Sequence, residues 1–266
     1  MVRALIGKTR KLLIPYFIYS CIYTLLLLIS GDISVPGISE YALNIFLGTI
    51  NGVQWFFLSL FLTSVFFVII TYLLKYEPLR FFVVIAIVAF GFFMGRFGVD
   101  NYFRLGSSCF SLGFYYLGYI LKKYKDRLIL KIKRIKWLLI SLIAVTEIIV
   151  FLLGKRYFDL MCNYEMDILI CYFVAVSGSA MVVVMAVLAS NIFLVKDVIA
   201  YIGRFSLFFY PLTNYCPLFF GKILGDSFFI DILGYFCGFA LSVICAGFYR
   251  MFSMGGIRSG ASENSL

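Results

Sequence analysis

The chain has 266 residues, of which 63% are hydrophobic and 14% are charged, and its mean hydropathy is +1.03. A soluble domain is about 45–50% apolar and about 25% charged, so this composition excludes a soluble globular protein, a disordered chain and a small secreted disulfide scaffold. The net charge is +10 and histidine is absent, which excludes a Ser-His-Asp or Cys-His nucleophile and a His-ligated metal site built from this chain alone.

Eight apolar segments approach the length of about 20 residues that a helix needs to cross a bilayer. We therefore expect an all-α, polytopic integral membrane helical bundle with about eight transmembrane helices. In chain order the expected spans are 12–30, 53–74, 81–95, 105–121, 137–154, 168–189, 198–220 and 229–252. The segment 41–50 is too short to span, and we interpret it as interfacial or re-entrant.

The basic residues follow the positive-inside rule if both termini are cytoplasmic. With eight spans, seventeen Lys and Arg residues fall in inside segments and five fall outside, and the inside residues include a dense cluster at 122–136. The outside segments carry eight of the thirteen acidic residues. This sidedness explains the positive charge without a nucleic-acid partner. We expect one membrane domain over residues 1–254, followed by a polar tail at 255–266.

The seven cysteines are scattered, and none forms a C-x-x-C pair. Most lie in apolar segments, where a cysteine is typically a small buried hydrophobic residue. We therefore expect no metal site and no bound cofactor.

Glu147 lies near the middle of the expected span 137–154. An ionisable residue at membrane depth is costly and points to a function by default. A proton relay, an acceptor for a sugar hydroxyl and a structural hydrogen bond all fit this position. Glu147 is thus a weak candidate for a catalytic carboxylate.

Lys8 and Lys11 belong to the basic run KTRKLLIPY. They are three residues apart and would share one face if the first helix extends back through them. Such a face can hold phosphates as point charges. A positive-inside anchor explains the same two residues by charge alone.

Two further places carry polar groups that suit a substrate. Asn51 and Trp55 lie where the segment 41–50 meets the second span, and an amide beside an aromatic ring suits a sugar, although Trp55 also suits an interfacial belt. Arg204 opens the span 198–220, where it snorkels to the interface or faces an anionic ligand. Pro211 interrupts that span near Asn214, so we interpret 211–215 as a cavity lining or a simple kink.

Five motifs, in order along nearly the whole chain, resemble acyltransferase family 3, the polytopic membrane O-acyltransferases that include the fucose-4-O-acetylase-like group. They are the basic-x-x-basic pair before LLIPY (8–16), QWFFLSLF (54–61), FSLGFYYLGYILKK (110–123), the segment 156–182 and YIGRFSLFFYPLTNY (201–215). The family typically has ten spans, so the resemblance implies that this domain is N-terminally incomplete and lacks the first two.

The resemblance implies transfer of acetyl from acetyl-CoA to a sugar hydroxyl of a surface polysaccharide or lipid-linked glycan in a bacterial inner membrane. Lys8 and Lys11 would match the basic pair near the acyl-CoA site. The family's Arg/Lys-x10-His motif, whose histidine is held to be catalytic, is absent, and Thr213 and Asn214 stand where a later histidine is common.

Two functions therefore remain open. The first is an acyltransferase-like protein, active or inactive as given. The second is a non-catalytic membrane protein that binds or transports a glycan or lipid-linked sugar. The expected partners are the lipid bilayer, acyl-CoA and a sugar or lipid-linked glycan acceptor, with a homo-oligomer as an alternative to a monomer.

Overall fold

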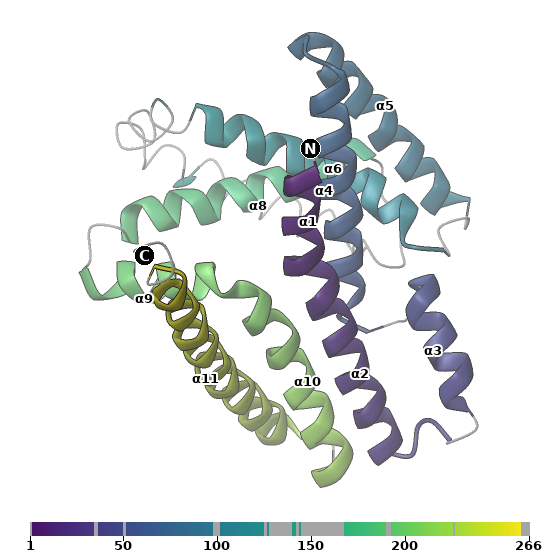
Figure 1. The fold of residues 1–266 in the computed structure, drawn as a ribbon, viewed down its shortest axis with the longest axis vertical. Coiled ribbons are helices and arrows are strands. Elements are labelled where there is room, and N and C mark those ends of the chain that lie inside the picture. The colour runs from purple at the N-terminus through teal and green to yellow at the C-terminus, as the bar shows by residue number, and fades with distance from the viewer. Residues whose placement is uncertain are drawn as a thin grey trace. The chain divides into compact units, whose positions relative to one another are not determined.

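A computed structural model of the chain describes residues 2–34, 37–49, 52–97, 102–124, 127, 140–141, 144, 168–189, 193–225 and 227–261. Helices are the regular elements of these residues, and no strand occurs among them, which confirms the expected all-α fold (Figure 1). The chain divides into two compact units. Unit 1 comprises Met1–Ile18 and Glu40–Lys196, and unit 2 comprises Tyr19–Ser39 and Asp197–Leu266.

The structure describes eleven helical elements in chain order. Their bounds are α1 Val2–Lys8, the π-helical turn η1 Thr9–Leu13, α2 Ile14–Ile29, α3 Ile38–Leu47, α4 Trp55–Leu73, α5 Glu77–Arg96, α6 Leu105–Lys123, α8 Ile168–Ala189, α9 Phe193–Arg204, α10 Ser206–Leu224 and α11 Phe228–Ala261. The last helix continues into the segment 255–266 that we expected as a polar tail.

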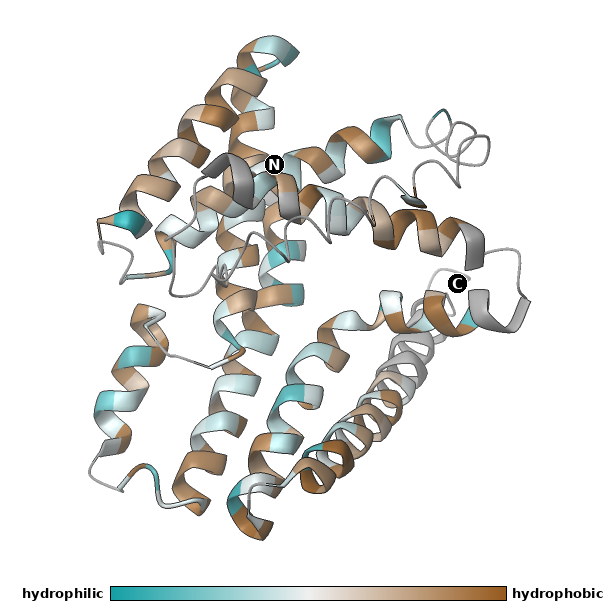
Figure 2. Cartoon of the chain, turned by 180° about the vertical axis from the view of Figure 1, so that it is seen from behind, coloured by the Kyte–Doolittle hydropathy of each residue, from teal (hydrophilic) through white to brown (hydrophobic). Residues whose placement is uncertain are grey.

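Four described helical stretches are long and apolar enough to cross a membrane: Leu5–Ile29, Trp55–Leu73, Glu77–Arg96 and Phe228–Phe248. They match the first, second, third and eighth expected spans, and the third is longer than the sequence suggested. Hydrophobic residues occupy most of the length of the helices (Figure 2). Large apolar side chains such as Phe82 and Phe90 of α5 stay exposed in the structure, which suits a lipid surrounding rather than water.

The other expected spans have different outcomes. Segment 137–154 lies outside the described residues except for 140–141 and 144. α6 and α8 form where expected, but α6 is too polar to count as a span by composition, and in α8 the apolar part is the shorter stretch Ala175–Val187. The short segment 41–50 is largely helical as α3, which is apolar but too short to span.

The seventh expected span is divided, but not where the sequence suggested. The chain turns at Phe205, whose ring is buried with Phe209 and Ala246, and this turn separates α9 from α10. Pro211, the expected break, is buried inside α10, and the helix continues through it. The interruption of this span therefore lies at Phe205 and not at Pro211, as the sequence had suggested.

In unit 1, α4, α5 and α6 enclose an apolar core that includes Val84 and Val88 of α5, Ile70 of α4 and Phe110 of α6. The helices α5 and α6 approach very closely at Gly91. A Cβ atom there would lie 2.6 Å from both the carbonyl oxygen of Gly106 and the amide nitrogen of Phe110. A residue without a side chain is therefore needed at this crossing, as is common where membrane helices pack.

A buried row of hydroxyl groups joins α4 to α6. The Thr63 hydroxyl donates to the Ser59 carbonyl at 2.8 Å and lies 2.8 Å from the carbonyl of Ser108 on the other helix. The Ser108 hydroxyl lies 2.6 Å from the carbonyl of Arg104 and 3.4 Å from the Ser59 hydroxyl. At this end of α6, Ser108 thus faces a neighbouring helix, where its hydroxyl and carbonyl groups act as hydrogen-bonding contacts.

In unit 2, α10 packs against α11 through two glycines that are four residues apart. A Cβ at Gly234 would lie 2.5 Å from the Cα of Pro217, and a Cβ at Gly238 would lie 2.6 Å from the carbonyl oxygen of Leu212. The Ser242 hydroxyl, one further turn along, lies 3.4 Å from the Phe208 carbonyl. This close pairing positions the face of α10 that carries the pocket described below.

We expect Gly91→Ala to destabilise unit 1, because the new methyl group would clash with backbone atoms of α6, which cannot move away as a flexible side chain could. The cost is about 1–3 kcal/mol, as for other overpacked cores. Gly118→Ala is the matched control, since Gly118 also lies inside a helix but a Cβ added there would have no neighbouring atom within 4 Å. Thermal unfolding in detergent should show a lower midpoint temperature than the wild type for Gly91→Ala but not for Gly118→Ala. Equal midpoints for the two variants would contradict the close approach.

Candidate functional site

Lys8 is held in place by a tyrosine that lies far along the chain. Its Nζ donates a hydrogen bond to the hydroxyl of Tyr115 on α6 at 2.9 Å, and the lysine is partly buried. Nζ lies 5.5 Å from the centre of the same ring. Because Nζ bonds the hydroxyl at the edge of the ring, we regard the contact as a hydrogen bond and not as a cation–π interaction. The Tyr115 ring is itself packed against Phe67 of α4, with centroids 5.0 Å apart.

Lys11 differs from Lys8 in its surroundings. It lies in the π-helical turn η1, its side chain is exposed, and it has no hydrogen-bond or ion-pair partner among the described residues. A π-turn holds more residues per turn than an α-helix, so residues three apart no longer align as they would on an α-helical face. The structure therefore holds one lysine of the pair in place and leaves the other exposed. π-turns within helices are frequent at functional sites.

The remaining site residues expected from the sequence are dispersed. Asn51 and Glu147 lie outside the described residues. Trp55 is the first residue of α4, partly exposed, with its ring edge-to-face with Phe56. Arg204 ends α9 with an exposed side chain, and the side-chain amide of Asn214 donates to the Tyr210 carbonyl of its own helix at 2.7 Å. Asn214 thus bonds to the backbone of its own helix and is not among the residues that line the pocket of unit 2.

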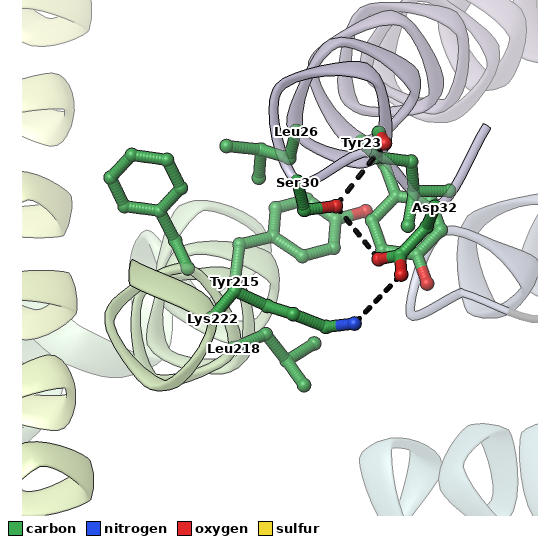
Figure 3. A pocket seen from close by; sticks show the side chains of 9 residues that line it. Tyr23, Leu26, Ser30, Asp32, Tyr215, Leu218 and Lys222 are labelled. Atoms are coloured by element: carbon green, nitrogen blue, oxygen red, sulfur yellow. Dashed lines mark hydrogen bonds and ion pairs between the residues drawn. The ribbon is translucent and has the colours of Figure 1, made fainter. Parts of the chain in front are cut away.

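Unit 2 contains a pocket between the end of α2 and the second half of α10 (Figure 3). Its volume is about 240 Å³. One wall is apolar, and polar groups gather at the end where the loop leaves α2. The lining residues are Tyr23, Leu26, Leu27, Ser30 and Asp32 from the first part of the unit and Tyr215, Leu218, Phe219 and Lys222 from α10. Tyr215 confirms one part of the cavity expected at 211–215.

An ion pair lies at the polar end of this pocket. The Lys222 ammonium group lies 2.8 Å from Oδ1 of Asp32, and the Ser30 hydroxyl donates to Oδ2 at 2.7 Å. The hydrogen bonds from Lys222 and Ser30 hold the pKa of Asp32 below its usual value. The side chains are 53% exposed for Lys222 and 37% for Asp32, so a ligand in the pocket can reach both. Exposed pairs of this kind add little to stability.

Three tyrosines of unit 2 pack together near this ion pair. The Tyr215 ring is buried, with the Tyr23 ring stacked on it at 5.3 Å and 22°, and the Tyr19 ring tilted against it at 6.3 Å. Tyr23 is only partly buried. The arrangement therefore presents one supported aromatic ring, a carboxylate, an ammonium group and a hydroxyl within one small space.

Sequence reasoning missed Tyr115 and the pocket residues other than Tyr215. The signal for Tyr115 was weak, because it belongs to an aromatic run, GFYYLGY, that resembles ordinary core sequence. The signal for the pocket was present but unused: the positive-inside count assigned both Asp32 and Lys222 to the outer side. Their contact places the two residues at the same end of unit 2.

A comparison with known families gives one match. The profile of a family described as an acyltransferase domain, acyltransferase family 3, matches residues 1–251. No curated protein and no solved structure matches the chain. The family resemblance inferred from the five motifs is thereby confirmed.

The lowered pKa of Asp32 predicts a pH-dependent contribution to stability. Since the folded chain binds this proton more weakly than the unfolded chain, the contribution is present above about pH 3.9, the usual aspartate value, and is lost as the pH falls through the lowered pKa. We expect the unfolding midpoint of the wild type to exceed that of Asp32→Asn slightly at pH 7 and to equal it well below pH 3.9. A difference that widens in acid would contradict the assigned pairing.

Proposed function

The chain belongs to acyltransferase family 3, and on this premise we propose that it transfers an acetyl group from acetyl-CoA to a sugar hydroxyl of a surface polysaccharide or lipid-linked glycan. It is a membrane protein of acyltransferase type, with apolar helices that are long enough to span. The proposed setting is a bacterial inner membrane, which follows from the family resemblance. Both termini are proposed to be cytoplasmic, because the basic residues are distributed in that way.

The contact between Lys8 and Tyr115 is the observation that supports a site for the donor. A lysine ammonium group has three donors, and Tyr115 accepts one of them, so two remain for a phosphate oxygen. The hydrogen bond reduces the motion of a long side chain before a ligand arrives, which lowers the entropy cost of binding. Lys11 adds a second, exposed positive charge within the next turn. The pair suits the phosphate groups of coenzyme A as point charges.

The proposed reaction moves one acyl group and one proton. The acceptor hydroxyl oxygen attacks the thioester carbonyl, a C–O bond forms, and the C–S bond breaks to release coenzyme A as a thiolate. A base takes the hydroxyl proton, which the thiolate finally receives. The chain has no histidine for this role, and Glu147 is the candidate carboxylate inside an expected span.

A second candidate function follows from that missing histidine. A non-catalytic relative would bind or transport the glycan without transferring acetyl. Both candidates require a sugar site, and they differ in whether label from the donor reaches the glycan. A transfer assay therefore separates them.

We expect Lys8→Ala to weaken acetyl-CoA binding about tenfold, which corresponds to about 1.4 kcal/mol, because the positioned ammonium group is lost. Lys11→Ala should weaken binding less, and Tyr115→Phe should show an intermediate loss because Lys8 keeps its charge and loses its support. Calorimetry on the full chain in nanodiscs measures these constants. Lys75→Ala, which removes an exposed lysine at the end of α4, is the control. If Lys8→Ala binds acetyl-CoA as tightly as the wild type, the donor site is refuted, and the two lysines serve only to orient the chain in the membrane.

We expect the full chain in nanodiscs to transfer labelled acetyl from acetyl-CoA to a glycan acceptor. Glu147→Gln should lower the rate by about 10²-fold or more, the usual size of a general-base contribution, while acetyl-CoA binding stays the same. Glu40→Gln, which changes an exposed carboxylate on α3, should leave the rate unaltered. Donor and glycan binding without any transfer by the wild type would refute the catalytic proposal and support the non-catalytic one.

A further inference from the structure

We propose that the pocket of unit 2 binds one neutral sugar ring, and that this ring is the acceptor. The identity of the ligand as an acceptor rests on the proposed function, whereas the preference for a neutral sugar rests on the pocket itself. Its elements are the ion pair of Asp32 with Lys222, the Ser30 hydroxyl and the ring of Tyr23 (Figure 3).

The charge of the pocket favours a neutral ligand. Lys222 is paired with Asp32 at 2.8 Å, so an anion would have to compete with a carboxylate already in place. A hydroxyl group has no such conflict. The Asp32 carboxylate offers about four lone-pair positions, of which the contacts with Lys222 and Ser30 use only part. Neighbouring hydroxyls of a sugar can therefore donate to Asp32 while the ion pair remains intact.

The aromatic side of the pocket suits the apolar face of a sugar ring. Tyr23 is stacked on the buried Tyr215, which fixes the plane of its ring. Leu26 and Leu218 extend the same wall. A rigid aromatic surface beside a few polar groups gives contact area at low entropy cost, as in other small-molecule sites.

The volume of the pocket suits a single sugar ring. At about 240 Å³, the pocket is smaller than the roughly 300–1,000 Å³ of sites that enclose a drug-sized molecule. It therefore does not enclose acetyl-CoA. A terminal sugar can enter while the rest of its glycan stays outside. The positive-inside count puts Asp32 and Lys222 on the outer side, where a surface glycan would present such a sugar.

The test is ligand-observed saturation-transfer NMR on the full chain in nanodiscs with methyl glycosides of neutral hexoses and 6-deoxyhexoses. We expect saturation transfer from the wild-type protein to the glycoside, and at least a fivefold loss of this signal in Asp32→Asn and in Lys222→Met. Tyr23→Phe keeps the ring and should retain most of the signal, whereas Tyr23→Leu should lose it. Unfolding midpoints of all variants, measured beside the wild type, confirm that the chain is folded.

The chain offers a matched control pair. Lys123 and Glu77 lie 2.7 Å apart with side-chain exposures of 40% and 44%, and neither lines the pocket. Glu77→Gln and Lys123→Met should leave the sugar signal unchanged. Wild-type signal in Asp32→Asn and Lys222→Met would overturn the proposal. Competition by inorganic phosphate that depends on Lys222 would also overturn it, because the pocket would then be an anion site.

The same variants separate this proposal from the proposed function. Sugar binding that depends on Asp32 and Lys222, without any acetyl transfer, supports the pocket and refutes the catalytic role. Acetyl transfer with an unchanged KM for the glycan in both variants refutes the pocket and leaves the catalytic role intact.

Discussion

The close approach of α5 and α6 at Gly91 is the constraint on which unit 1 depends. With no side chain at that position, the α6 backbone comes within reach of α5, and the other face of α6 turns its hydroxyl groups toward α4. Lipid supplies no hydrophobic force between helices, so small residues and interhelical hydrogen bonds hold them together. α6 in turn carries Tyr115, the hydroxyl that bonds Lys8. The proposed donor site therefore depends on a glycine crossing that contains no functional group.

The two proposed binding sites, one in each unit, are both supported by a packed tyrosine, but they differ in charge. In each, a packed tyrosine contacts a residue of the proposed site and limits its motion. Tyr115 bonds the ammonium group of Lys8, and Tyr215 stacks on the Tyr23 ring, which lines the pocket together with Asp32. A ligand that meets positioned groups loses less entropy on binding. The lone ammonium group suits phosphate, and the paired charges suit hydroxyl groups, so the same physical argument gives the two charged sites different ligands.

Much of the helical pattern could be predicted from the sequence. The apolar runs near 12–30, 53–74 and 229–252 form helices that are long enough to cross a membrane, as a run of about 20 apolar residues predicts. The boundary at Phe205 was not predictable in this way. Pro211 is the stronger local signal for a break, but the chain turns at Phe205, which packs with Phe209 and Ala246. Likewise, a three-residue spacing suggested equal roles for Lys8 and Lys11, and a π-turn made their surroundings unequal.

The sequence by itself determined the class, the helical pattern and the family, because hydropathy and short motifs are local properties of the chain. Only the tertiary structure decided which side chains meet. Lys8 and Tyr115 are 107 residues apart, and Asp32 and Lys222 are 190 apart, so no spacing along the chain reports either contact. Both form because helix packing brings distant turns together, and the candidate sites of this protein are built from those long-range contacts.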